Sequence, residues 1–230
     1  MNRTLKILSL LLTYPSSEIL QEIPALKLAL AEDLKDTHHT KALDKLTDDL
    51  ASLDLYDAQE RYVYLFDRTR TLSLHLFEHI HGESRDRGQA MVDLMAVYEE
   101  NGLSIDEKEL PDYMPLFLEY LATRTESEAQ EMLGQTLHIV TAMRERLKKR
   151  KSIYANVFLA LEAFAKSKPD QALVDTILAR PEDDPNDLKA LDEIWEEEVV
   201  TFGGNSDVFY AYILRTPLLR CLSASRYSHR

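Results

Sequence analysis

Apolar side chains recur at intervals of three and four residues through almost the whole chain, and this spacing is the strongest constraint on its fold. Leu5, Leu8 and Leu12 show it near the N-terminus, and the leucines of residues 43–53 show it again. In an α-helix such positions share one face, which packs against a core. No segment alternates apolar and polar residues over a useful length, as a half-buried strand does. We therefore predict an all-α fold.

The composition agrees with helices, because only six glycines and eight prolines occur among 230 residues. Sandwiches and barrels need turn residues at much shorter intervals. We predict one compact domain of about nine to ten helices over residues 1–202. A linker is expected near residues 181–185, before a last acidic helix, and residues 203–230 are expected to form a C-terminal tail.

Local signals predict where the helices begin and end. Pro24 is expected to kink or break the second helix, Asp57 to cap the fourth, and Pro111 to open a later one. Gly102 stands where a helix stop is expected. The expected helices lie near residues 3–13, 16–34, 43–53, 58–66, 84–101, 111–122, 127–149, 152–166, 169–180 and 187–200, with a further apolar stretch at 72–80 and a buried stripe of Met91, Leu94, Met95 and Tyr98.

The first apolar run superficially resembles a signal peptide, because Arg3 and Lys6 accompany residues 5–12. The run is short, Lys6 interrupts it, and no small-x-small cleavage site follows it closely. We expect a core helix there, and no other segment approaches the length of a membrane span. Cys221 is the only cysteine, which fits a reducing cytoplasm and leaves no disulfide framework.

The formal charge of −13 and the pI near 5.0 argue against nucleic acid as the main partner, because an acidic surface repels phosphate backbones. Such a surface suits a cationic partner, although acidity also serves solubility. A basic run at residues 144–151 is expected at a helix C-terminus, where it opposes the negative end of the helix dipole.

A possible zinc site is the pattern His75-Leu-Phe-Glu78-His79, which matches the H-x-x-E-H motif of inverted zinc proteases. In such enzymes two histidines on one helix face bind zinc, and the glutamate acts as a general base. The alternative is that these side chains belong to a polar cluster without metal. A zinc-dependent hydrolase is thus the alternative interpretation of this motif, and we predict no metal and no cofactor.

Aromatic residues gather around the same part of the chain. At helical spacing most of them should lie in the core, and the remainder, near Glu78 and Asp112, are candidates for a groove that binds an apolar peptide with a cationic end. The set comprises Tyr62, Phe66, Phe77, Tyr98, Tyr113, Phe117 and Tyr120.

Three stretches give the sequence a family resemblance. They are residues 62–68 (Tyr-x-x-Leu-Phe-Asp-Arg), 76–91 (Leu-Phe-Glu-His-x-His-Gly-Glu-Ser-Arg-Asp-Arg-Gly-Gln-Ala-Met) and 110–121 (Leu-Pro-Asp-Tyr-x-Pro-Leu-x-Leu-Glu-Tyr-Leu). Residues 11–15 and 191–198 add to the likeness. Together they resemble NarJ-type proteins, the assembly chaperones of respiratory nitrate reductase, within the wider TorD/DmsD-like group of redox-enzyme chaperones.

The resemblance implies an all-helical, cytoplasmic, non-catalytic protein. Such chaperones bind the N-terminal segment of the molybdenum-containing catalytic subunit and hold it until its molybdopterin guanine dinucleotide is inserted, before membrane attachment. Contact with the proteins that deliver the cofactor is left open. The wider group carries a Pro-Asp-His motif for leader binding, and here it reads Pro111-Asp112-Tyr113. The rival reading is a helical scaffold or adaptor without a maturation role.

From these features we predict a client groove in which aromatic side chains meet the apolar face of a basic amphipathic segment. Carboxylates beside them would bind its cations. The aromatic wall is Tyr62, Phe66, Phe77 and Tyr120; the carboxylates are Glu78, Glu83, Asp86 and Asp112; and His79, Arg87 and Tyr113 complete the candidate site.

Overall fold

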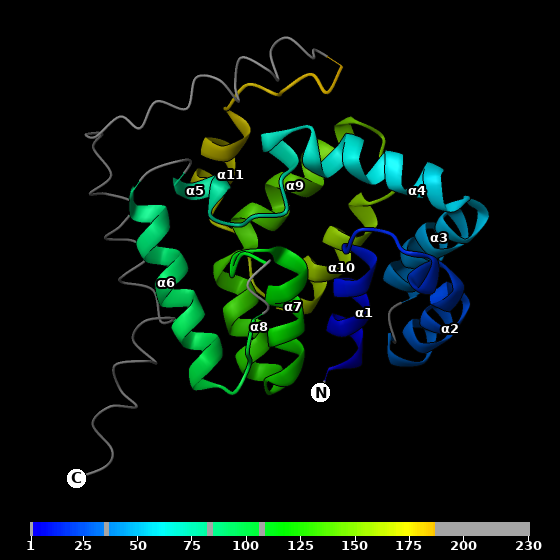
Figure 1. Ribbon diagram of the computed structural model, residues 1–230, viewed down its shortest axis with the longest axis horizontal. Helices are drawn as coiled ribbons and strands as arrows, with labels where there is room; N and C mark the ends of the chain where they lie inside the picture. The colour runs from blue at the N-terminus through cyan, green and yellow to red at the C-terminus, as the bar shows by residue number, and fades with distance from the viewer. Residues whose placement is uncertain (1, 35–36, 82–84, 106–108, 187–230) are drawn as a thin grey trace.

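The computed structural model describes residues 2–34, 37–81, 85–105 and 109–186, and the regular structure within these ranges is helical (Figure 1). This confirms the all-α prediction, with eleven α-helices among the described residues. They are α1 (Arg3–Leu11), α2 (Ser17–Asp33), α3 (Thr37–Ser52), α4 (Leu55–Tyr62), α5 (Glu78–His81), α6 (Arg85–Glu100), α7 (Met114–Thr123), α8 (Glu126–Gln135), α9 (Leu137–Lys149), α10 (Ala155–Ala165) and α11 (Gln171–Leu178), with a π-helical turn η1 (Val63–Asp67) and a 3₁₀ turn η2 (Arg70–Leu72).

The helices pack around one continuous apolar core. Helix α1 packs against α7 and α2, α9 packs against α10 and α11, and α3 lies against both α2 and α10. In Figure 1, α2 and α3 form one edge of the molecule and α6 forms the opposite edge. The segment between α4 and α6 therefore runs across the body of the protein.

Helix α1 is a core helix, as its leucine spacing predicts. The Asn2 side chain caps it by accepting a hydrogen bond from the Leu5 N–H at 3.1 Å. Leu5, Leu8 and Leu12 are fully buried, and the Ser9 hydroxyl donates to the Pro115 carbonyl of α7 at 2.7 Å. No helix in the described ranges has both the length and the apolarity needed to cross a bilayer.

Helix α2 has its predicted extent, and it continues through Pro24 without a break. Two other predicted boundaries are wrong. Helix α4 is capped by Asp54, whose carboxylate accepts from the Asp57 N–H at 2.9 Å, so the cap stands one turn before the predicted residue. The predicted helix at residues 127–149 is two helices that meet at Thr136, where the backbone leaves helical geometry.

The stretch predicted as apolar helix at residues 72–80 is mostly not helical. It forms η2, then an extended segment, and only then the short helix α5. Helix α7 begins at Met114 rather than at Pro111, with Pro115 in its first turn. The cause of both differences is a tertiary pairing between these two segments, described below.

Helix α6 packs less of its surface than predicted. Leu94 and Tyr98 are buried as expected, but Val97 completes the buried stripe, whereas Met95 is 40% exposed. The stop at Gly102 is confirmed, because its φ of +77° is the left-handed geometry that glycine adopts without strain.

Residues 181–186 have no regular secondary structure, yet they are attached to the body. The Asp183 carboxylate accepts from the Thr71 N–H at 3.1 Å, and the Asp183 carbonyl accepts from Arg150 at 3.0 Å. The division of the chain into domain, linker and tail stays a prediction, and the expected helix at 187–200 and tail at 203–230 lie outside the described residues.

A buried hydroxyl offers a test of this packing. Tyr98 is fully buried and donates to the Pro111 carbonyl at 2.9 Å. Tyr98→Phe leaves that carbonyl without its donor, so we expect the free energy of unfolding in urea to fall by about 1–2 kcal/mol. Tyr56→Phe is the control, because Tyr56 is 80% exposed; an equal loss in both variants would contradict the assignment.

Candidate functional site

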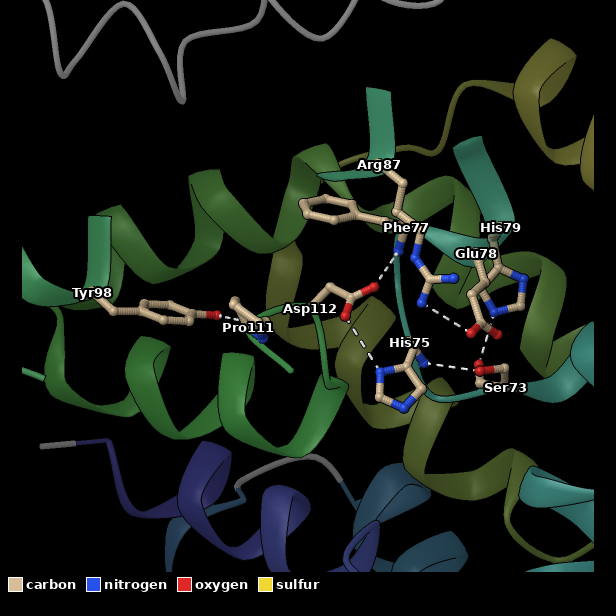
Figure 2. Close-up of polar contacts among 9 residues, drawn as sticks. All are labelled: Ser73, His75, Phe77, Glu78, His79, Arg87, Tyr98, Pro111 and Asp112. Carbon is tan, nitrogen blue, oxygen red and sulfur yellow. Dashed lines mark hydrogen bonds and ion pairs between the residues drawn. The ribbon is translucent and has the colours of Figure 1, made fainter. Parts of the chain in front are cut away.

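Two extended segments far apart in sequence lie side by side at the centre of the candidate site (Figure 2). His75 and Tyr113 form an antiparallel bridge. The Leu76 N–H donates to the Asp112 carbonyl at 3.0 Å, and the Met114 N–H donates to the Leu74 carbonyl at 2.8 Å. Buried backbone N–H and C=O groups need hydrogen-bond partners, and in these two non-helical segments the pairing supplies them.

The Asp112 carboxylate completes the pairing from its side chain. It is fully buried, accepts from the Phe77 N–H at 3.0 Å and lies 3.3 Å from Nδ1 of His75. Burial by itself lowers the pKa of His75. The hydrogen bond to Asp112 and the charge of its carboxylate raise that pKa by more than burial lowers it, so the net effect is a raised pKa. Asp112 therefore has a structural role here, with both carboxylate oxygens next to protein donors, and its contact with a cation of the client stays a prediction.

His79 is a buried, neutral histidine. Its Nε2 lies 2.8 Å from the Ser73 carbonyl, so Nε2 carries the proton. Burial lowers the pKa of His79 to about 4. Beside it, Glu78 and Arg87 form an ion pair at 3.0 Å that links α5 to α6, and Figure 2 shows this pair next to the His79 ring.

The geometry does not support the zinc pattern. His75 lies in the extended segment and His79 in α5, so the two rings do not share a helix face. Each already has a protein partner, Asp112 and the Ser73 carbonyl. Within the described residues, no group of three histidine, cysteine or acidic side chains is placed to hold a metal ion.

Most of the predicted aromatic wall belongs to the core. Tyr62, Phe66 and Tyr120 are each 3% exposed. The Tyr62 hydroxyl donates to the Leu12 carbonyl at 3.0 Å, so in the 2.9 Å contact between the two phenols Tyr113 is the donor. Burial raises the pKa of Tyr113. Tyr62 and Tyr120 thus help to position α1, α4 and α7, whereas Phe66, although only 3% exposed, lies in the wall of the cavity described below.

The rest of the predicted set divides into three groups. Phe77, Glu78, Asp86, Arg87 and Tyr113 are partly exposed. His79 and Asp112 are buried. Glu83 lies outside the described residues. The structure thus brings Glu78, Arg87, His75 and His79 together around one cavity, and Tyr113 connects His75 to the buried Tyr62.

A cavity of about 550 Å³ opens beside this cluster. Its wall is polar and rich in charge of both signs, with a basic excess. The lining residues are Phe66, Asp67, Thr69, Arg70, Thr71, Ser73, His75, Glu78, His79, Arg87, Arg146, Arg180, Pro181 and Asp183.

Sequence reasoning missed Arg146 in this wall. The basic run at residues 144–151 does end helix α9, as predicted, but Arg146 is 2% exposed. A signal was available: Arg146 stands three residues after Met143 and one before Leu147, both fully buried. It therefore lies on the inward stripe of the helix.

The helical architecture defines a class of protein. It resembles the crystal structure of a putative redox enzyme maturation protein from Archaeoglobus fulgidus, with a TM-score of 0.53 over 73% of this chain and 94% of that one, at 23% sequence identity. At this identity the likeness establishes that the two proteins share a helical fold.

Sequence comparison then defines the family. Residues 32–160 match the model of the nitrate reductase delta subunit family. The chain is 44% identical over 204 residues to the nitrate reductase molybdenum cofactor assembly chaperone NarJ of Escherichia coli K12, covering 86% of this chain and 84% of that one. It is 34% identical to the probable NarJ chaperone of Bacillus subtilis strain 168, covering 70% and 86%. The chain therefore belongs to the nitrate reductase delta subunit family, and the two relatives described here are named as nitrate reductase assembly chaperones.

The buried carboxylate yields a stability prediction. Asp112→Ala removes the acceptor for both Phe77 and His75, and we expect it to lower the free energy of unfolding by about 2–4 kcal/mol. Asp112→Asn keeps one oxygen acceptor and should lose less. Denaturant titration measures both, with Glu22→Ala on exposed α2 as the control. Wild-type stability in Asp112→Ala would contradict the structural role.

His79 predicts a pH dependence. Its folded pKa of about 4 lies below the usual 6.5, so the unfolded chain binds the proton first. The stability from neutral His79 is present above pH 6.5 and is lost as the pH falls toward 4, by about 3 kcal/mol. Arg146 and Arg180 keep the ring neutral and Glu78 opposes them.

His79→Gln can still donate to Ser73 but does not titrate. Urea unfolding should show a steeper loss between pH 6.5 and 4 in the wild type than in this variant. Burial also lowers the pKa of His138 to about 4. Because His138 is present in both proteins, its contribution to the pH dependence is the same in both and cancels in the comparison. Parallel curves would contradict the assignment.

Proposed function

We propose that this chain is a maturation chaperone that binds the N-terminal segment of the catalytic subunit of a respiratory nitrate reductase. It holds that subunit in the cytoplasm until the molybdenum cofactor is inserted, before membrane attachment. The 44% identity to an assembly chaperone of this enzyme carries the proposal. Proteins that deliver the cofactor are further candidate partners.

The burial of Tyr62, Phe66, Tyr120 and Asp112 moves the proposed binding surface to the outer face of α6. Exposed residues at helical spacing form this face: Gly88, Val92, Met95, Ala96 and Glu99. Val92 is 60% exposed and Met95 40% exposed. Nothing lies within 4 Å of the position that a β-carbon of Gly88 would occupy. The packing within this chain therefore does not require glycine at position 88. Because glycine has no side chain, the backbone of a partner could approach α6 closely at this point.

Charge supports the same occupant. An amphipathic segment with basic residues would place its apolar side on Val92 and Met95 and its cations near Glu99. The chain's net charge of −13 favours the approach of such a segment. Phe77 and Glu78, at the neighbouring helix α5, extend the proposed surface.

Calorimetry with the client's N-terminal peptide tests this surface. Met95→Asp places a charge in the apolar stripe, and we expect the affinity to fall by at least about tenfold, because the peptide would have to bury an unpaired carboxylate. Leu28→Asp is the matched control, since Leu28 is 68% exposed on α2 at the opposite edge. Equal affinities for wild type and Met95→Asp would place the client elsewhere.

The role in maturation has a separate test. Nitrate reductase purified from cells lacking this protein should be deficient in molybdenum by elemental analysis, and the gene for this chain should restore the metal. A fully loaded enzyme would instead support a scaffold or adaptor role.

A further inference from the structure

The cavity between η2, α5, α9 and the end of α11 has features that the chaperone role does not explain. Its wall contains four arginines but only three carboxylates, which are Asp67, Glu78 and Asp183. Two of these carboxylates already have donors, since Glu78 pairs with Arg87 and Asp183 accepts from Thr71 N–H. In a chain of net charge −13 this is an unusual local excess of cations.

Arg146 is the deepest of these cations. It is 2% exposed, and its hydrogen bonds go to backbone carbonyls: Thr71 at 2.8 Å, Ile177 at 2.7 Å and Arg180 at 3.4 Å. Among the described residues no carboxylate pairs with it. Burial lowers its pKa, and the neighbouring Arg180 and Arg150 add to this effect, whereas the charges of Glu182 and Asp183 oppose it without reversing it. A guanidinium remains charged in proteins, so this positive charge is incompletely compensated.

Arg180 shows the same preference at the cavity mouth. It is exposed, and its guanidinium donates to the Glu78 carbonyl at 3.3 Å rather than to a carboxylate. Both arginines therefore hold their positions through neutral acceptors. Their charges stay available to an anion in the space between them.

Buried polar atoms in the cavity wall lack partners. The Thr71 hydroxyl, Nε of Arg87 and Nε of Arg146 are inaccessible to solvent and have no hydrogen-bond partner in the described part of the chain. Buried polar groups are normally satisfied, and each exception destabilises the protein by about 1–3 kcal/mol. Three such atoms in one wall indicate a site for a ligand rich in acceptor oxygens.

We propose that this cavity binds a phosphate-bearing small molecule, whose phosphate is attracted by the charges of Arg146 and Arg180 and satisfies the Thr71 hydroxyl once that side chain turns toward the cavity. Guanidinium groups match phosphate by paired hydrogen bonds, and a cavity of about 550 Å³ is within the usual range for a small ligand. Arg87, held by Glu78, and His75, held by Asp112, border the same space. The proposal rests on the cavity wall and not on the proposed function, although Glu78 borders both the cavity and the proposed client surface.

Titration calorimetry of the full chain with inorganic phosphate and pyrophosphate tests the proposal. We expect saturable binding, tighter for pyrophosphate because it offers more oxygens to the same donors. Citrate is the comparison, since it carries similar charge on carboxylates. Absence of saturable pyrophosphate binding at millimolar concentration would overturn the site, and an equal affinity for citrate would overturn the assignment to phosphate.

Two variants locate the binding without touching the buried Arg146. Arg180→Gln removes an exposed cation, and we expect about tenfold weaker pyrophosphate binding. Thr71→Val removes a hydroxyl that has no partner, so the melting temperature should not fall while the affinity does. Arg3→Gln, which alters an arginine paired with Asp33 on the surface, is the control. Wild-type affinity in both cavity variants would overturn the proposal.

Discussion

The buried carboxylate of Asp112 is the interaction on which the central architecture depends. It accepts a hydrogen bond from Phe77 N–H, a residue 35 positions away, and holds the His75 ring. The two backbone hydrogen bonds beside it allow a non-helical stretch to cross the core without unsatisfied donors. That stretch sets where α5 begins and where α7 starts, and α7 in turn packs against α1.

The sequence predicts well where the decisive interactions are local. Leucine spacing places α1 in the core, and Gly102 marks the end of α6, because periodicity and backbone freedom are properties of short segments. It fails where a distant partner decides. Residues 72–80 are apolar enough for a helix, yet pairing with residues 111–114 draws them into an extended conformation. No pattern within either segment reveals that pairing.

The same distinction explains the candidate site. Tyr62 and Phe66 stand at helical spacing, which predicts a common face but not whether that face meets solvent or core; both are buried. Among the charged residues of the central motif, Glu78 pairs with Arg87 nine positions later, and no pattern in the sequence indicates that particular pairing. A basic residue within a basic run is usually solvated, so the run by itself does not predict that Arg146 is buried. Its position on the inward-facing stripe of the helix, beside Met143 and Leu147, decides its burial.

One ion pair connects the two surfaces proposed for this chain. Arg87 belongs to the first turns of α6, whose outer face is the proposed client surface, and its partner Glu78 lines the cavity. The carbonyl of Glu78 also fixes Arg180 at the cavity mouth. A segment bound on α6 and an anion in the cavity would thus act on the same pair. If either one shifts it, linkage requires that each changes the other's affinity by the same factor.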